Sequence, residues 1–253
     1  MMNTLVYDGT WIGLLCCVYE VYAKKLDQIA VVSESRFMPD AFSEVNKVVS
    51  DELRARRVWD GLATRISKKA MHRLYTCYLS ELPDIGSSIC TFIRLAFDMP
   101  ESPEQAYAIP SVLRISKVDR MVHREKHRME AFIRFQLTRD DLYFATIEPD
   151  FNVLPLIAKH FKNRYADQRW LIFDLKRNYG IYYDLEVVSE VIIDRTGAEK
   201  KGKNIFSDDE PLYQKLWQEY FAHVNITERK NTKLHLMHVP RRYWKHLTEK
   251  LVD

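Results

Sequence analysis

The sequence predicts an α+β fold, and three observations lead to it. The chain has 253 residues, 47% of them hydrophobic, so it can bury a sizeable core. Its first half and middle carry apolar residues at helical spacing, whereas its second half contains short apolar runs between polar turns, which are typical of antiparallel strands. Three of its nine prolines lie within 99–110. We expect a single α+β domain over 1–253, with a sub-boundary at 99–110 between a mainly helical N-terminal half and an α+β C-terminal half.

The N-terminal region begins with a β-turn-α unit. Leu5–Asp8 is a short apolar run that predicts a buried strand, and Thr10 is a good N-cap for a helix from Thr10 to Lys24. Ile29–Ser33 is a candidate second strand. The rest of this region has helical spacing, over Ser50–Leu79 with a break near Gly61 and over Ser87–Phe97, which is mostly apolar and therefore buried.

The clearest helix is expected over Ser111–Leu137, and it is both amphipathic and basic. At 100° per residue, its apolar residues fall on one side and its basic residues largely on the other. We expect the apolar side to pack, and the basic side to face either an anionic ligand or water. The apolar residues are Val112, Ile115, Val118, Val122, Met129 and Ile133, and the basic ones are Lys117, Arg120, Arg124, His127, Arg128 and Arg134.

The C-terminal half is expected to contain a sheet and further helices. Three apolar runs separated by short polar turns favour an antiparallel meander rather than crossover units. The expected strands are Leu142–Glu148, Arg169–Asp174, Tyr179–Asp184 and Glu186–Asp194. Helices are expected over Val153–Tyr165, Asp208–His223 with Ser207 as cap, and Arg241–Glu249 after Pro240, with a loop over Thr196–Asn204.

The positive charge is concentrated in three basic islands. A net charge of +3 is by itself too small to indicate a nucleic-acid-binding protein. Within 51–73, 111–139 and 229–250, however, Lys and Arg clearly outnumber Asp and Glu. If these islands meet in space, they form a surface suited to a polyanion.

The C-terminal segment adds aromatic residues to its cations. Arg241, Arg242 and Lys245 flank Tyr243 and Trp244. Such a combination can hold phosphates while it stacks on bases. The same residues could equally close an ordinary domain, with the aromatic rings anchoring the last helix and the arginines paired to acids.

Two motifs resemble known sites but lack part of the required chemistry. Gly197–Asn204 nearly matches a phosphate-binding loop, but Asn204 offers no hydroxyl to Mg²⁺ and no helix begins at the Gly-Lys pair, so we expect no nucleotide hydrolysis. His123 and His127 have the i, i+4 spacing of a metalloprotease helix, but the intervening Glu125 is misplaced.

We therefore expect no metal and no cofactor. A further ligand from Asp8, Glu20, Glu148 or His160 would be needed to complete a metal site with the two histidines. The four cysteines have no metal-binding or iron–sulfur spacing, and we expect them to be buried, reduced thiols.

The sequence does not predict a membrane protein. The longest apolar stretch, Trp11–Tyr19, is far shorter than the roughly 20 residues of a membrane span. The N-terminus has no positive segment ahead of an apolar one, so we expect a cytoplasmic protein without a secretory signal or a membrane partner.

The chain resembles a bacterial family of DNA metabolism and DNA repair proteins that contain the domain of unknown function 4130. The resemblance is carried by three segments, Tyr7–Tyr22, Val122–Phe135 and Val239–Glu249. The resemblance extends over nearly the whole chain, except that Asn225–Arg229 departs from the Asn-Pro-x-Arg of other members. Members are typically encoded beside a DNA-modification radical SAM protein, and some are fused to a uracil-DNA glycosylase-like domain. The motif positions of the family correspond here to His127, Arg128, Met129, Phe132, Arg134, Phe135, Arg242, Tyr243 and Trp244.

Charge and resemblance together favour a DNA-binding accessory protein that acts with a radical SAM partner. Its expected nucleic-acid-binding residues are Lys117, Arg124, Arg128, Arg134, Arg241, Arg242, Tyr243, Trp244 and Lys245. The alternative is an enzyme acting on a nucleic-acid base or phosphate. His127 would then be the general acid or base, Arg128 would stabilise negative charge, and Asp8 or Glu20 would orient or bind the substrate. A protein that only docks its partner is the third hypothesis.

Overall fold

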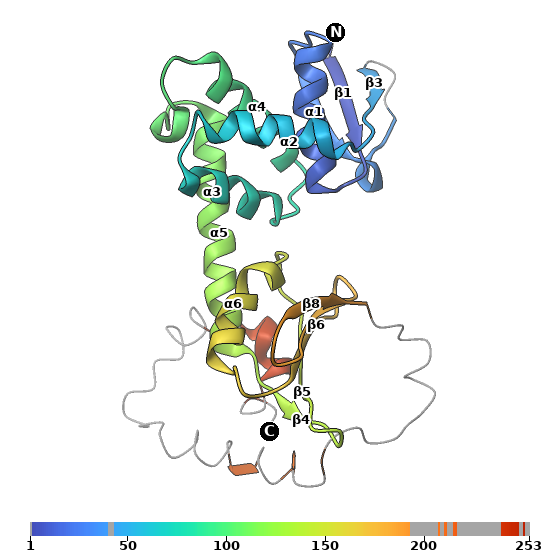
Figure 1. Cartoon of the computed structure of the whole chain (residues 1–253), viewed down its shortest axis with the longest axis vertical. Coiled ribbons are helices and arrows are strands. Elements are labelled where there is room, and N and C mark those ends of the chain that lie inside the picture. The colour runs from blue at the N-terminus through green and yellow to red at the C-terminus, as the bar shows by residue number, and fades with distance from the viewer. Residues whose placement is uncertain are drawn as a thin grey trace. The chain divides into compact units, whose positions relative to one another are not determined.

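The computed structural model describes residues 2–39, 43–192, 207, 210–211, 215–216, 239–247 and 250. Over these residues the chain is α+β, which confirms the predicted fold class (Figure 1). It divides into two compact units, Met1–Arg124 and Glu125–Asp253, and the division falls inside helix α5 (Pro110–Phe132). The expectation of a single domain over 1–253 with a sub-boundary at 99–110 stays a prediction.

The first unit contains a parallel three-stranded sheet with the order β2-β1-β3. The predicted opening is confirmed: β1 (Met2–Tyr7) leads into α1 (Trp11–Ala23), and the Thr10 hydroxyl caps α1 by accepting from the Gly13 N–H at 2.9 Å. The expected second strand is β2 (Ile29–Ser33). The third strand, β3 (Ser43–Lys47), was not predicted, because its sequence SEVNK has no apolar run.

Helices complete the first unit. The predicted helical segments form α2 (Glu52–Ala63), α3 (Lys68–Tyr78) and α4 (Ile85–Asp98), and the break lies between α2 and α3, just after Gly61. Short 3₁₀ turns occur at Glu34–Arg36 and Pro103–Gln105. All four cysteines are buried in this unit and form no disulfide, as expected.

Helix α5 confirms the predicted amphipathic pattern but ends early. Its apolar residues Val112, Ile115, Val118, Val122 and Met129 are all nearly inaccessible to solvent. The helix was expected to reach Leu137, but it ends at Phe132. Gln136–Leu137 instead forms β4 and pairs with β5, so backbone pairing in the sheet prevails over helical continuation.

The second unit contains a five-stranded sheet with the order β4-β5-β6-β7-β8. The expected meander is confirmed, because β6 (Trp170–Asp174), β7 (Tyr179–Tyr183) and β8 (Val188–Val191) pair antiparallel. The sheet also holds a parallel pair, β5 (Tyr143–Ile147) with β6, because α6 (Leu154–Arg164) connects these two strands as a crossover helix. Every residue of β6 is buried, as befits the central strand.

The C-terminal segment is only partly described. After Pro240 the chain forms a 3₁₀ helix over Arg241–His246, shorter than the helix expected to reach Glu249. The expected loop at 196–204, and most of the expected helix at 208–223, lie outside the described residues. Among the helices in the described ranges, none combines the length and apolar character that crossing a membrane would require.

Candidate nucleic-acid interface

The last turns of α5 present two different faces within the second unit. Residues 125 and 128 lie on one face, whereas 127, 130 and 131 lie on another, as the 100° step of a helix requires. The second face borders a cleft of about 810 Å³ that also contains residues of β5, α6 and the loop after α5. This volume lies within the roughly 300–1,000 Å³ of small-molecule pockets.

Aromatic side chains form much of the cleft wall. Phe135, Phe161 and Tyr165 support one another: the Phe135 ring lies edge-on to the rings of Phe161 and Tyr165, with centroids 5.7 and 5.4 Å apart. The rings of Phe161 and Tyr165 are nearly parallel, at 9° and 6.1 Å. Tyr143 of β5 also lines the cleft. Because each ring of the trio is held by the other two, this wall is organised before any ligand binds.

The cleft also contains ionisable side chains of both kinds. Arg134, Arg164, His127 and His160 line it together with the acids Glu130 and Glu210. The Arg134 guanidinium donates to the carbonyls of Ala131 and Ile133, at the end of α5. Arg164 is exposed at the end of α6, and its guanidinium lies 5.8 Å from the centre of the Tyr165 ring. The cleft therefore combines aromatic surface with cations.

Glu130 is the centre of a small charged group inside this cleft. Its carboxylate lies 2.8 Å from Lys126 Nζ, 3.9 Å from His127 Nδ1 and 3.8 Å from His160 Nδ1. The His127 side chain is 86% exposed, so its imidazole is accessible to a ligand. Two imidazoles beside one carboxylate can bind an anion, or can transfer a proton if a substrate is bound.

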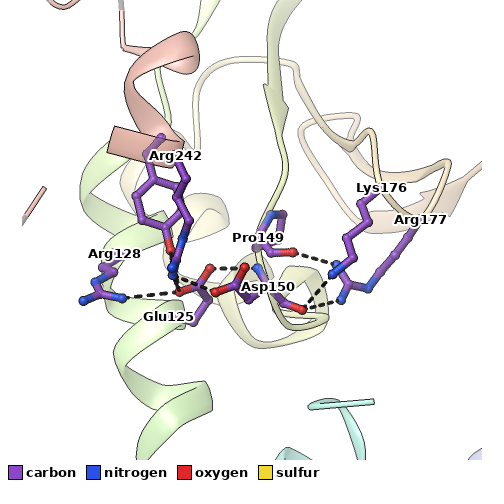
Figure 2. Close-up of polar contacts among 8 residues, drawn as sticks. Glu125, Arg128, Pro149, Asp150, Lys176, Arg177 and Arg242 are labelled. Carbon is purple, nitrogen blue, oxygen red and sulfur yellow. Dashed lines mark hydrogen bonds and ion pairs between the residues drawn. The ribbon is translucent and has the colours of Figure 1, made fainter. Parts of the chain in front are cut away.

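On the other face of α5, the buried carboxylate of Glu125 fixes the C-terminal segment (Figure 2). Glu125 is 1% exposed. It accepts hydrogen bonds from the Tyr243 hydroxyl at 2.6 Å, the Asp150 N–H at 2.9 Å and Arg242 Nη2 at 3.2 Å. Arg128 Nη1 lies 3.7 Å away. These charge-assisted contacts compensate for the cost of burying the carboxylate.

The same contacts perturb the ionisation of the two C-terminal residues. Burial, together with the hydrogen bond to Glu125, raises the pKa of Tyr243, so its hydroxyl stays a donor. Burial alone would lower the pKa of Arg242, but Tyr243, Glu125 and Asp150 raise it on balance. Arg242 also pairs with Asp150 at 2.8 Å. These are the contacts of the anchoring alternative for the C-terminal segment, whereas phosphate binding by Arg242 and Tyr243 stays a prediction.

A second polar group lies at the carboxyl ends of the parallel strands β5 and β6. Asp174, the fully buried last residue of β6, pairs with Arg177 at 2.8 Å. Arg177 also donates to the carbonyls of Pro149 and Asp150, and Lys176 donates to the Asp150 carbonyl (Figure 2). These bonds hold the loop after β5, and thereby the Asp150 amide that binds Glu125.

The remaining predicted residues of the C-terminal segment lie on its exposed side or pack locally. Lys245 pairs with Glu148 at 2.5 Å. The Trp244 indole donates to the Val239 carbonyl, and the exposed Arg241 lies over the Trp244 ring at 5.8 Å. Their role in nucleic-acid binding stays a prediction.

The other predicted residues belong to the first unit. Asp8 accepts from the Thr10 N–H and hydroxyl and from the Ser50 hydroxyl, at 2.6–2.9 Å. Burial would raise the pKa of Asp8, but these hydrogen bonds lower it on balance. Glu20 pairs instead with Arg54 at 2.9 Å and with Lys24 at 3.2 Å. Asp8 and Glu20 thus have separate partners.

Two cations of α5, Lys117 and Arg124, are exposed in the first unit. His123 Nδ1 lies 3.2 Å from Asp119. In the described ranges no three His, Cys, Asp or Glu side chains are grouped so that they could hold a metal ion. The phosphate-loop-like segment 197–204, and the residues of the third basic island before 239, lie outside the described residues.

Several residues of this interface were not predicted, although one left a signal. The buried stripe of α5 runs through Val118, Val122, Met129 and Ile133, and position 125 fills the gap between Val122 and Met129. An acid on an apolar stripe must be buried with partners, so the pattern could have indicated the Glu125 network. Arg164, Tyr165 and Tyr143 gave no such signal, because only the packing of α6 and β5 brings them to one cleft.

The fold and the site define an α+β protein whose second unit contains an aromatic-lined cleft with two arginines and two histidines. A family model matches residues 83–249, which include α4, α5 and the site. The chain belongs to this family, which is described as a domain of unknown function, DUF4130. This confirms the resemblance carried by Val122–Phe135 and Val239–Glu249, whereas Tyr7–Tyr22 lies before the match.

The other comparisons add little. No curated protein matches the chain. One similar solved structure is the pGpG-specific phosphodiesterase PggH from Vibrio cholerae, at 11% identity and a TM-score of 0.33, over 88% of this chain and 99% of that one. A likeness this distant does not indicate a function.

Proposed function

We propose that the protein is a nucleic-acid-binding accessory protein of a DNA repair or modification system, which acts with a radical SAM partner. The observation that carries the binding proposal is the cleft of the second unit, which four aromatic side chains, two arginines and two histidines line together. Aromatic faces beside cations are the combination with which proteins hold unpaired bases and the phosphates between them. The repair context and the radical SAM partner rest on the resemblance to DNA metabolism proteins.

Phosphates would be bound mainly by cations that remain accessible. Arg164 has no hydrogen bond or ion pair to a residue that the structure describes, and Arg241 has only its contact with Trp244. Lys117 and Arg124 are exposed on α5 and add further phosphate contacts in this proposal. Arg242 is held by two carboxylates, so its first task is to keep the C-terminal segment in place.

Fluorescence anisotropy with a labelled oligonucleotide at several salt concentrations tests this proposal. Affinity should fall steeply with salt, since each phosphate contact releases counterions. Arg164→Ala should lower affinity for all sequences alike and reduce the salt slope by about 1. Lys159→Ala is the matched control, because Lys159 is exposed on the same helix but does not line the cleft.

Either of two results would contradict the binding proposal. The first is binding that does not respond to salt. The second is binding that is unchanged in a double variant of Arg164→Ala and Arg241→Ala.

An enzyme acting on a base or a phosphate is the second candidate, and the position of Glu130 between His127 and His160 favours it. In that case His127 would transfer the proton and Glu130 would hold its imidazole. A labelled oligonucleotide incubated with the protein, then treated with or without alkali, reports strand cleavage or base release. Product formed by the parent protein, but lost in His127→Ala while binding is retained, would establish chemistry. His127→Ala with intact binding, and no product from the parent protein, supports the accessory function.

A further inference from the structure

We infer that the cleft of the second unit takes a single unpaired nucleotide, with its base against the Tyr143 side of the aromatic wall and a phosphate at Arg164. The protein would therefore prefer single-stranded or locally unpaired DNA to an intact duplex. This inference rests on the proposed function and specifies the ligand of the same site.

The aromatic wall itself provides the first argument. In a duplex the faces of the bases are stacked on one another, so a protein ring can reach them only when a nucleotide leaves the stack. Phe135, Phe161 and Tyr165 already occupy one another's faces and edges. Tyr143 is half-buried in the cleft, and no described aromatic ring packs against it. It is therefore the ring best placed to stack on a base.

The charged residues indicate how the nucleotide is oriented in the cleft. Arg164 sits at the rim, exposed and without a polar partner among the described residues. Glu130 would repel a phosphate, but Lys126 at 2.8 Å compensates for its charge. Glu210 is buried and accepts from the Leu137 N–H at 2.8 Å. The phosphate thus belongs at the Arg164 rim, and the base belongs between Tyr143 and Glu130, whose carboxylate can accept from its amino groups.

The size of the site supports one nucleotide rather than a helix. A cavity of about 810 Å³ accommodates a base with its sugar and phosphate. A duplex could touch only the rim cations, and the aromatic wall would then contribute nothing to its affinity. The bases should therefore contribute to the affinity for a single strand but not to the affinity for a duplex.

The experiment compares three fluorescently labelled DNA probes of equal length by anisotropy with the full chain. The probes are a single strand, the same strand with a central run of abasic nucleotides, and the duplex. The first two carry the same phosphates and differ only in bases. Because base–aromatic stacking has a substantial energy per base, the single strand should bind about 5- to 150-fold more tightly than the abasic strand. It should also bind more tightly than the duplex.

Two variants test whether Tyr143 is the ring that stacks on the base. Tyr143→Leu should reduce affinity for the single strand toward that for the abasic strand and leave the abasic affinity unchanged. Tyr143→Phe keeps the ring and should bind like the parent protein, and circular dichroism checks that both variants are folded. If Tyr143→Leu does not fold, the comparison of the abasic and normal strands in the parent protein still decides whether bases contribute to the affinity.

The outcomes separate the inference from the proposed function. Equal, salt-dependent binding of the abasic and normal strands would overturn the inference and leave nucleic-acid binding intact. Tighter binding of the duplex would do the same. No binding of any probe would overturn both.

Discussion

Removing the hydroxyl of Tyr243 measures how strongly the C-terminal segment is held against α5. Tyr243 is 2% exposed and donates to the buried carboxylate of Glu125 at 2.6 Å. In Tyr243→Phe that carboxylate keeps the Asp150 N–H and Arg242 but loses its shortest hydrogen bond, and Arg242 loses the hydroxyl to which it donates. Hydrogen bonds to charged groups contribute about 1.5–3 kcal/mol, and the Phe ring still fills the site, so we expect a loss of that size.

Differential scanning calorimetry provides the assay, because it separates two transitions if the two units melt independently. For a chain of this size, a loss of about 1.5–3 kcal/mol corresponds to a decrease in Tm of roughly 3–12 °C. The matched control is Tyr182→Phe, because Tyr182 is half-buried in the same unit and its hydroxyl has no hydrogen bond to a described residue. That variant should change stability by no more than about 0.5 kcal/mol.

A double-mutant cycle identifies the partner. Glu125→Gln keeps the shape of the side chain but removes its charge, so the Tyr243 hydroxyl should matter less in that background. The reasoning is refuted if Tyr243→Phe is as stable as the parent protein, or if the effects of Tyr243→Phe and Glu125→Gln simply add.

Three further predictions concern the first unit. Gly13→Ala should destabilise the protein by about 1–3 kcal/mol in urea unfolding, because the new Cβ would lie 2.3 Å from Asp8 Oδ1. In Gly61→Ala the new Cβ meets only Phe97, at 3.4 Å, so this control variant should be neutral or stabilise the protein by up to about 1 kcal/mol. Burial raises the pKa of Tyr7, so above about pH 10 this side chain ionises more readily in the unfolded chain than in the folded one. The free energy of unfolding should therefore fall above about pH 10, and it should fall less in Tyr7→Phe. An equal fall in the variant and the parent protein would contradict this. The pKa of Asp8 is lowered on balance, so its ionised carboxylate stabilises the fold above the ordinary carboxyl pKa, and this stability is lost as pH falls through and below that value. In Asp8→Asn the free energy of unfolding should therefore depend less on pH in acid. An unchanged dependence would contradict this.

The sequence predicted those elements whose residues carry their own signal. The Thr10 cap, the helical spacing of α5 and the meander β6-β7-β8 all follow from local pattern, and each is found where expected. β3 was missed because it has no apolar run, and parallel pairing with β1 defines it as a strand. The end of α5 was misplaced for the same reason, since pairing of β4 with β5 is a long-range contact that helical periodicity does not contain.

The residues of the candidate site were likewise predicted only in part. Cations and aromatic residues of α5 and of the C-terminal segment were identified from composition, but composition could not tell which of them would be held by acids. The structure pairs Arg242 with Glu125 and Asp150, and leaves Arg164, which was not predicted, without a described polar partner. Such differences depend on which side chains meet after folding, and a count of charges does not contain that information.

The two faces at the end of α5 connect stability to the proposed function. Glu125 and Glu130 lie on the same two turns of one helix, the first fixed by the C-terminal segment and the second within the cleft. The contacts of Glu125 therefore help to set the position of the turn that presents His127 and Glu130. A variant that frees the C-terminal segment, such as Tyr243→Phe, should weaken nucleic-acid binding even though Tyr243 is buried and lies outside the cleft. Because Arg241 belongs to the freed segment, the salt slope should fall as well if Arg241 binds a phosphate, and it should stay unchanged if only the turn of α5 is displaced.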